Sequence, residues 1–144
     1  MAAIAIVLLW LGQAGFGILA RSGYRLVTEQ EDPPSLTNRG SMLERGRGAS
    51  GDYGTALRLF RLAADQGYAP AMTDLAVMYE KGEGTPGDYA AAAKWNLEAW
   101  DRGGEKWAAY RLANFYENGL GVEKNQAVAN FWNTLASSPA AMCG

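Results

Sequence analysis

Acidic side chains that could pair as a general acid and a general base recur at matching intervals along the chain. Asp65 and Asp101 are 36 residues apart, and Glu80 and Glu117 are 37 residues apart. Such carboxylates could move protons or hold a metal ion if they met in one cleft. Matching intervals of this size more simply indicate equivalent positions in a repeat, each on a solvated surface.

The chain lacks the other residues that catalysis would need. It has no histidine, which removes the usual proton carrier near neutral pH, the commonest metal ligand and any Ser–His nucleophile pair. Its one cysteine, Cys143, lies beside the C-terminus and cannot build a cysteine-rich metal site or an internal disulfide. We therefore expect no catalytic residue, no metal ligand, no cofactor-binding residue and no cofactor of the chain's own. A cell-wall or β-lactam hydrolase is the least favoured function, since no Ser-x-x-Lys motif occurs.

Two further ligand classes are also disfavoured. Gly82 and Gly84 flank a glutamate, and no Gly-Lys-Ser/Thr follows them, so this loop does not match a phosphate-binding loop. The net charge is −2, with both signs scattered along the chain. That charge pattern gives no basic footprint for nucleic acid.

The first part of the chain is apolar. Residues 2–20 carry no charged side chain, and a helix of that length would span about 28 Å, close to the hydrocarbon thickness of a bilayer. Three interpretations stay open for residues 1–21: a membrane anchor, a cleaved signal peptide, and a segment buried against a partner subunit. Residues 22–35 are acidic near their end and contain Pro33 and Pro34, which predicts a linker that does not continue a helix.

After this linker the sequence repeats. Residues 42–53 match residues 78–89 at an offset of 36, sharing Met, Glu, two glycines and a closing Gly-Asp-Tyr. Residues 71–99 match residues 108–136 at an offset of 37. Periods of this size indicate stacked supersecondary units. The sequence predicts units at 36–67, 71–103 and 108–137, followed by a loose tail at 138–144.

Each unit has the pattern of two helices. In the first helix, small and aliphatic residues fall on one face at spacings of three and four, and a Gly-x-Gly follows its end. In the second, an alanine and tryptophan stripe follows an Asp or Asn that can cap free N–H groups. The expected caps are Asp52, Asp88 and Asn125, the expected helix ends are Gly67, Gly82, Gly103 and Gly119, and the expected stripes contain Leu75, Ala76, Tyr79, Ala92, Trp95 and Ala99 with their counterparts Leu112, Ala113, Tyr116, Ala129, Trp132 and Ala136.

The first unit departs from this pattern. Arg39 stands where the later units have Leu75 and Leu112, and Gly40 stands where they have alanine. Glycine costs about 1 kcal/mol in a helix relative to alanine, and an arginine cannot be buried there unpaired. We therefore expect the opening helix, over residues 36–43, to be short or frayed. An atypical terminal unit is typical of a cap.

The repeat resembles the Sel1-like repeats, on the alanine-leucine helix, the Tyr, the Gly-x-Gly and the second helix with alanine and an aromatic residue. Residues 71–136 carry the resemblance best, and residues 42–67 carry a weaker copy. The resemblance implies an all-α fold, a short α/α solenoid of two to three helix pairs similar to tetratricopeptide repeats. It also implies an adaptor or assembly subunit, often in bacterial envelopes. The branch of the family with a cysteine pair in each repeat is a poor match.

Some side chains break the repeat register and are candidates for partner contact. Trp95 and Trp132 recur in register and are expected in the core, whereas Trp100 and Trp107 have no aromatic counterpart. The resemblance implies binding along a concave wall lined by the first helices, where other off-stripe positions lie. The candidate partner-contact residues are Val77, Trp100, Trp107, Tyr110, Arg111 and Asn114.

We expect the chain to be a non-catalytic subunit and not an enzyme. It would dock on and stabilise a membrane-associated bacterial complex such as a respiratory dehydrogenase. Its partners would be proteins in a stable complex and the membrane, through residues 1–20, and not nucleic acid. By resemblance alone, small helical-repeat subunits accompany membrane-bound quinohaemoprotein alcohol dehydrogenases. The alternative is a free exported or cytoplasmic adaptor that binds peptide segments. We expect the protein to lie in the bacterial cell envelope. The habit of the family favours the periplasmic face for the repeats, whereas Arg21 and Arg25 weakly favour the cytoplasmic side.

Overall fold

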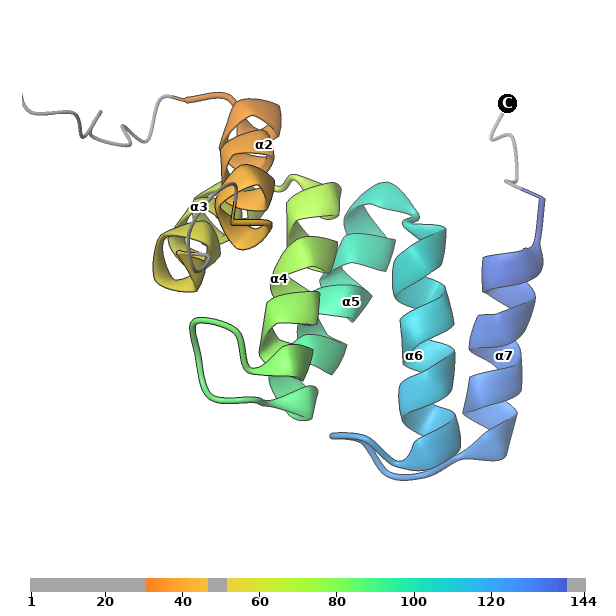
Figure 1. The fold of residues 1–144 in the computed structure, drawn as a ribbon. Coiled ribbons are helices and arrows are strands. Elements are labelled where there is room, and N and C mark those ends of the chain that lie inside the picture. Colours follow the sequence, from red (N-terminus) through yellow and green to blue (C-terminus); the bar gives the residue numbers. More distant parts are fainter. Residues whose placement is uncertain (1–30, 47–51, 140–144) are drawn as a thin grey trace, which may run out of the picture.

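The computed structural model describes residues 31–46 and 52–139, and these form helices joined by short loops, without a strand among them. Figure 1 shows their order along the chain. The helices are α2 (Pro33–Glu44), α3 (Tyr53–Asp65), α4 (Ala69–Lys81), α5 (Tyr89–Gly103), α6 (Lys106–Asn118) and α7 (Gln126–Ser137). The predicted all-α class is therefore confirmed.

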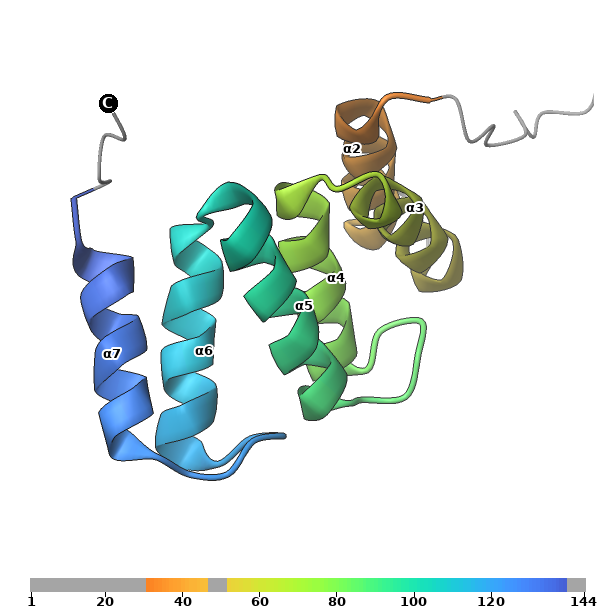
Figure 2. The ribbon, with the colours of Figure 1, turned by 180° about the vertical axis from the view of Figure 1, so that it is seen from behind.

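The helices stack in chain order. Each helix packs against the next one in the chain, and α2 also contacts α4. The first helices, α2 and α4, lie toward the viewer in Figure 1, and the second helices, α3 and α5, lie in front when the molecule is turned round in Figure 2. The α6–α7 pair ends the row. This is the architecture of a solenoid, in which each unit contacts only its neighbours.

The helix boundaries follow the predicted caps. Asp52, Asp88 and Asn125 each accept a hydrogen bond, at 3.0–3.1 Å, from the backbone N–H three residues ahead. Gly82 and Gly119 follow α4 and α6 with φ of 72° and 71°, the left-handed conformation that favours glycine. The expected end at Gly103 moves by one residue. Gly103 is the last residue of α5, and Gly104 takes the left-handed cap.

The second glycine of each of the two later Gly-x-Gly loops, Gly84 and Gly121, lies against the start of the preceding unit's second helix. A Cβ placed on Gly84 would come within 2.5 Å of the Tyr53 carbonyl oxygen, and one on Gly121 within 2.3 Å of the Ala90 nitrogen. Both glycines also have positive φ. The two loops therefore touch the start of that second helix so closely that only glycine fits.

The predicted stripes form the core, in two neighbouring clusters. The first lies mainly among α2, α3 and α4, and the second lies mainly among α5, α6 and α7. Alanine allows the helices to approach closely, and larger side chains such as Phe60 and Phe115 fill the remaining volume. The buried stripe residues are Leu75, Ala76, Ala92, Ala99, Leu112, Ala113, Ala129 and Trp132, whereas Trp95 is half-buried.

The prediction for the first helix was wrong. Residues expected to be short or frayed form α2, which has 12 residues. Gly40 is buried because the ring of Phe60 occupies the place of its missing side chain, 2.8 Å from where a Cβ would lie. Arg39 is half-buried but forms an ion pair with Glu31, so it is not an unpaired charge.

The proline pair begins this helix instead of closing a linker. Asp32 caps it by accepting a hydrogen bond from the Ser35 N–H at 3.0 Å, and the prolines occupy the first turn, where no backbone N–H partner is needed. Residues 33–35 of the predicted linker therefore belong to α2. The predicted leader, the rest of the linker before residue 31, and residues 140–144 of the predicted tail lie outside the described residues. Within the described part of the chain, no helix is long and apolar enough to cross a membrane.

We predict that Gly121→Ala lowers the free energy of unfolding by about 3 kcal/mol, because it adds a backbone clash to the left-handed strain. The control is Gly104→Ala, since Gly104 has φ of 61° but open space where its Cβ would lie. That variant should lose only about 1 kcal/mol. Urea unfolding followed by circular dichroism measures both. If the two variants lost equal free energy of unfolding, the close approach of the Gly121 loop to the backbone of α5 would be unimportant for stability.

Candidate partner-binding surfaces

The outer side of α6 exposes two large aromatic side chains. Trp107 and Tyr110 are 55% and 56% exposed. Their rings stack, with centroids 5.5 Å apart and planes at 17°. Such stacking restrains both side chains before any partner arrives, which lowers the entropy cost of binding.

Arg111 holds this aromatic pair to the preceding unit. Its guanidinium lies over the Trp107 ring, 5.5 Å from the centroid, and forms an ion pair with Glu80 of α4. Its Nε is buried and has no hydrogen-bond partner among the described residues. A hollow of about 230 Å³ opens beside these groups and is also lined by Asn114. We call Trp107, Tyr110, Arg111 and Asn114 the α6 surface.

The structure therefore brings four of the six candidate contact residues together and separates the other two. Val77 is half-buried on α4. Trp100 was expected to be an exposed anchor, and this needs correction. It is half-buried in the second core cluster, and its ring meets that of Trp132 edge to face with centroids 5.9 Å apart. The position that matches Trp100 in the last unit is Ser137. The lack of an aromatic counterpart therefore does not by itself indicate that a tryptophan is exposed.

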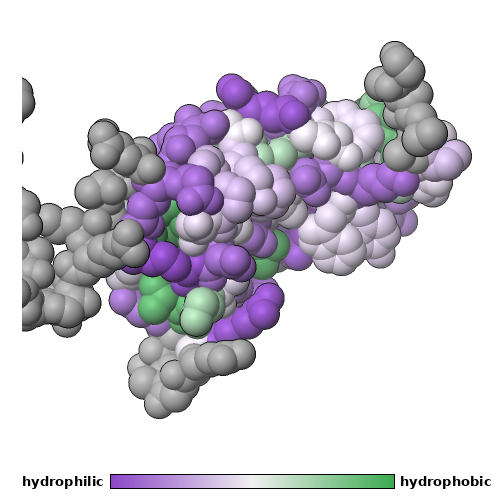
Figure 3. Space-filling model, turned by 90° about the horizontal axis from the view of Figure 1, so that it is seen from above, coloured by the Kyte–Doolittle hydropathy of each residue, from purple (hydrophilic) through white to green (hydrophobic). Residues whose placement is uncertain are grey.

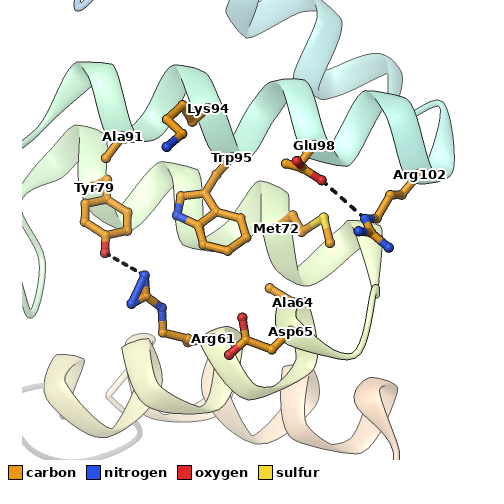
Figure 4. A pocket seen from close by; sticks show the side chains of 10 residues that line it. All are labelled: Arg61, Ala64, Asp65, Met72, Tyr79, Ala91, Lys94, Trp95, Glu98 and Arg102. Atoms are coloured by element: carbon orange, nitrogen blue, oxygen red, sulfur yellow. Dashed lines mark hydrogen bonds and ion pairs between the residues drawn. The ribbon is translucent and has the colours of Figure 1, made fainter.

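A second surface lies between the second helices. A hollow of about 470 Å³ is bounded by α3 and α5 and floored by Met72 and Tyr79 of α4. Figure 4 shows the Trp95 ring projecting into it. Arg61 lies over this ring, 5.7 Å from its centroid, and donates a hydrogen bond to the Tyr79 hydroxyl at 3.5 Å. We call this the α3–α5 groove.

The sequence did not reveal the α3–α5 groove. The recurrence of Trp95 and Trp132 in register predicted burial, but a helix can pack one side of an indole and leave the other open. The one signal was Arg61, which stands where the later units have Leu97 and Thr134. Along its rim, Glu98 pairs with Arg102 at 3.3 Å, while Lys94 and Asp65 add one charge of each sign.

Asp74 carries the most perturbed charge on the first-helix side. Burial is the main cause that raises the pKa of its carboxyl to about 6, and the neighbouring Glu44 adds to the shift. Asp74 occupies the position of Arg111 one unit earlier, and Glu44 occupies that of Glu80. At these positions the last two units thus meet through an ion pair, whereas the first two place two acids near each other, and Lys81 of α4 lies 4.0 Å from Glu44.

Within the described residues, the carboxylates that recur at matching intervals do not form a metal site. Asp65 lies at the end of α3 and Asp101 near the end of α5, both exposed, while Glu80 is engaged with Arg111. Across the described ranges, no group of three or more acidic or cysteine side chains is placed to hold a metal ion.

A family model describes the fold. The model of the Sel1 repeat matches residues 33–68, 69–100 and 108–138. The chain belongs to the Sel1 repeat family. The first match includes α2, so the degraded unit counts as a repeat.

Solved structures agree with this assignment. A protective antigen of uropathogenic Escherichia coli that displays an SLR fold is 33% identical, with a TM-score of 0.68 over 72% of this chain and 22% of that one. A Sel1 repeat protein from Oxalobacter formigenes is 28% identical, with a TM-score of 0.67 over 73% of this chain and 41% of that one. The chain thus spans less than half the length of either protein. Comparison with curated proteins gives no match, and nothing found supports a subunit of a quinohaemoprotein alcohol dehydrogenase.

Hydrophilic side chains are interspersed with small apolar patches on the face seen from above (Figure 3). No broad apolar area covers that face. Recognition there would depend on a few anchoring side chains, which is the usual distribution of binding energy in a protein interface.

We predict that Asp74→Asn raises the free energy of unfolding at pH 7.5 by on the order of 1 kcal/mol. The carboxyl has a pKa of about 6 in the fold and about 3.9 when unfolded, so its charge destabilises the fold above pH 6. This penalty disappears as the pH falls toward 4, and the gain should disappear with it. Urea unfolding at both pH values measures the gain, with exposed Asp101→Asn as control. A gain of the same size at pH 4 would contradict the electrostatic cause.

Proposed function

We propose that this chain is a non-catalytic subunit that binds a partner protein through the α6 surface. Sel1 repeat proteins generally mediate protein–protein interaction, and their fold is typically a non-catalytic scaffold. The observation that carries the proposal is the exposed, stacked pair of Trp107 and Tyr110 beside Arg111. Tryptophan, tyrosine and arginine are the residues most enriched where binding energy concentrates.

The surroundings of the pair fit this role. Glu80 and the Trp107 ring hold the Arg111 guanidinium in place, so little side-chain entropy remains to be lost on binding. Asn114 adds an exposed amide that can donate and accept hydrogen bonds at the edge of the hollow. The site thus combines an aromatic centre with a polar rim, the usual arrangement of a protein interface.

The proposal includes attachment to a membrane-associated bacterial complex, in the cell envelope and with the periplasmic face favoured. Residues 2–20 support this part, because they are uncharged and long enough to span a bilayer as a helix. A solenoid of few repeats also has a small core, which a permanent partner would stabilise. A respiratory dehydrogenase is one such complex. The alternative is a free adaptor that binds peptide segments, and the α3–α5 groove is the observation in its favour.

Replacement of the anchors tests the binding surface. We predict that Trp107→Ala and Tyr110→Ala each weaken binding to the co-purified partner by about tenfold or more. The matched control is Phe131→Ala, because Phe131 on α7 is 57% exposed and loses a ring of similar size. Affinity is measured by surface plasmon resonance. All three variants should unfold within about 1 kcal/mol of the parent. Unchanged binding by both α6 variants would overturn the proposed site.

Removal of residues 2–20 tests the membrane attachment. We predict that the full chain sediments with membranes and resists extraction by high salt, because apolar contacts do not weaken with ionic strength. The truncated chain should move to the soluble fraction. N-terminal sequencing of the native protein is the second readout. A processed N-terminus together with soluble behaviour would contradict an anchor and favour the free adaptor.

A further inference from the structure

The α3–α5 groove is the place that an aromatic ring fills one unit later. Trp95 on α5 and Trp132 on α7 are equivalent positions, and Ala64 on α3 is the equivalent of Trp100 on α5. The Trp100 ring packs edge to face on Trp132, with centroids 5.9 Å apart, and Trp132 is only 9% exposed. Ala64 has no ring to lay on Trp95, which stays half-buried and borders the groove.

The open surface of the groove is its walls and rim, because its bottom belongs to the core. Ala64 and Met72 are 3% and 2% exposed, so they form a packed floor. Above this floor, Trp95 and Tyr79 are partly exposed. A ring brought by a ligand would therefore lie against the open sides of two aromatic side chains, in the offset or edge-to-face geometry that aromatic pairs prefer.

Two cationic side chains border this aromatic wall at the Tyr79 end. Arg61 comes from α3 and Lys94 from α5, and Figure 4 shows both on the side of the Trp95 ring that is nearer to Tyr79. Within the described residues neither forms an ion pair, and Arg61 donates a hydrogen bond to the neutral Tyr79 hydroxyl. This end of the groove therefore carries positive charge that a carboxylate of a ligand could neutralise.

The other end of the groove has the opposite charge. Asp65 lies there on α3, and Glu98 on α5 is engaged with Arg102. The two acids outnumber the one base, so a second carboxylate would be repelled at this end. The charges thus favour a ligand with one carboxylate beside its aromatic group over a ligand that is acidic along its whole length.

We propose that the α3–α5 groove binds a short extended segment of another protein in which an acidic and an aromatic side chain stand two residues apart. Such side chains point to the same side of an extended chain, about 7 Å from each other. The Arg61 guanidinium lies 5.7 Å from the centre of the Trp95 ring. One segment can therefore place its carboxylate between Arg61 and Lys94 while its ring lies on Trp95.

The length of the groove fits a segment of this kind. Its wall on α5 runs from Ala91 to Arg102, about 16 Å along the helix axis, which is room for about five extended residues. The inference goes beyond the proposed function, because no residue of the α3–α5 groove belongs to the α6 surface.

Two synthetic peptides test the inference on the full chain. Each is blocked at both ends and contains one glutamate and one phenylalanine two residues apart among glycines and serines, in the two possible orders. We expect at least one order to bind and to shift the indole N–H resonance of Trp95 in nuclear magnetic resonance spectra. The Trp95→Phe variant identifies that resonance by its absence. A peptide with glutamine in place of glutamate should bind about threefold more weakly.

Variants of the two cations test how the carboxylate is recognised. Arg61→Gln and Lys94→Gln should each weaken binding of the glutamate peptide by about threefold and barely change binding of the glutamine peptide. A damaged fold would weaken both peptides equally. The matched control is Lys124→Gln, which removes the charge of an exposed lysine outside the groove and should leave both affinities unchanged.

Three outcomes would overturn the inference. The first is that neither peptide shifts the Trp95 resonance at concentrations up to about 5 mM. The second is that Arg61→Gln and Lys94→Gln both leave the affinity for the glutamate peptide unchanged. The third is that N-acetylphenylalanine binds as tightly as the peptides, because the groove would then take a small anionic aromatic molecule.

Failure here is distinguishable from failure of the proposed function, because Trp107→Ala should weaken partner binding and leave peptide binding intact. If no peptide binds while Trp107→Ala still weakens partner binding, the inference falls and the proposed function stands. If the peptides bind as expected while partner binding ignores Trp107, the α6 surface is rejected and the groove is kept.

Discussion

The stack depends on the contact between the two later Gly-x-Gly loops and the start of the second helix in the unit before each. Gly84 and Gly121 come so close to that helix that a Cβ would lie 2.5 Å and 2.3 Å from backbone atoms. Backbone atoms cannot rotate aside as the end of a flexible side chain can. The loop therefore sets the spacing between units, and the buried alanines make this spacing possible because small side chains let helices approach.

A stack held in this way has two unlike ends. The N-terminal end is closed by the Arg39–Glu31 ion pair and by α2, whose Gly40 makes room for Phe60. The C-terminal end carries α6 with its exposed aromatic pair. One unit earlier, the counterpart of Tyr110, Thr73, is only 7% exposed, whereas Tyr110 itself is 56% exposed.

The sequence predicts most of the fold because the repeat, the helix caps and the glycine ends are local signals. It fails at α2, because the burial of Gly40 depends on Phe60, twenty residues away, which fills the same space. Trp100 and Trp107 both break the register, yet one packs on Trp132 and the other on Tyr110. Only the positions of the neighbouring helices determine that Trp100 is half-buried and Trp107 is exposed. For the same reason, Trp95 was expected in the core, and its position under Arg61 became visible only in three dimensions.

On the proposed function, α6 is where this chain meets its protein partner. Hydroxyl-radical footprinting tests this directly, because it labels exposed side chains in the complex as purified and in the separated chain. We expect Trp107 and Tyr110 to lose reactivity in the complex, whereas Phe131 and Met42, which are 57% and 58% exposed, keep theirs. Equal reactivity of Trp107 and Tyr110 in both states would contradict it.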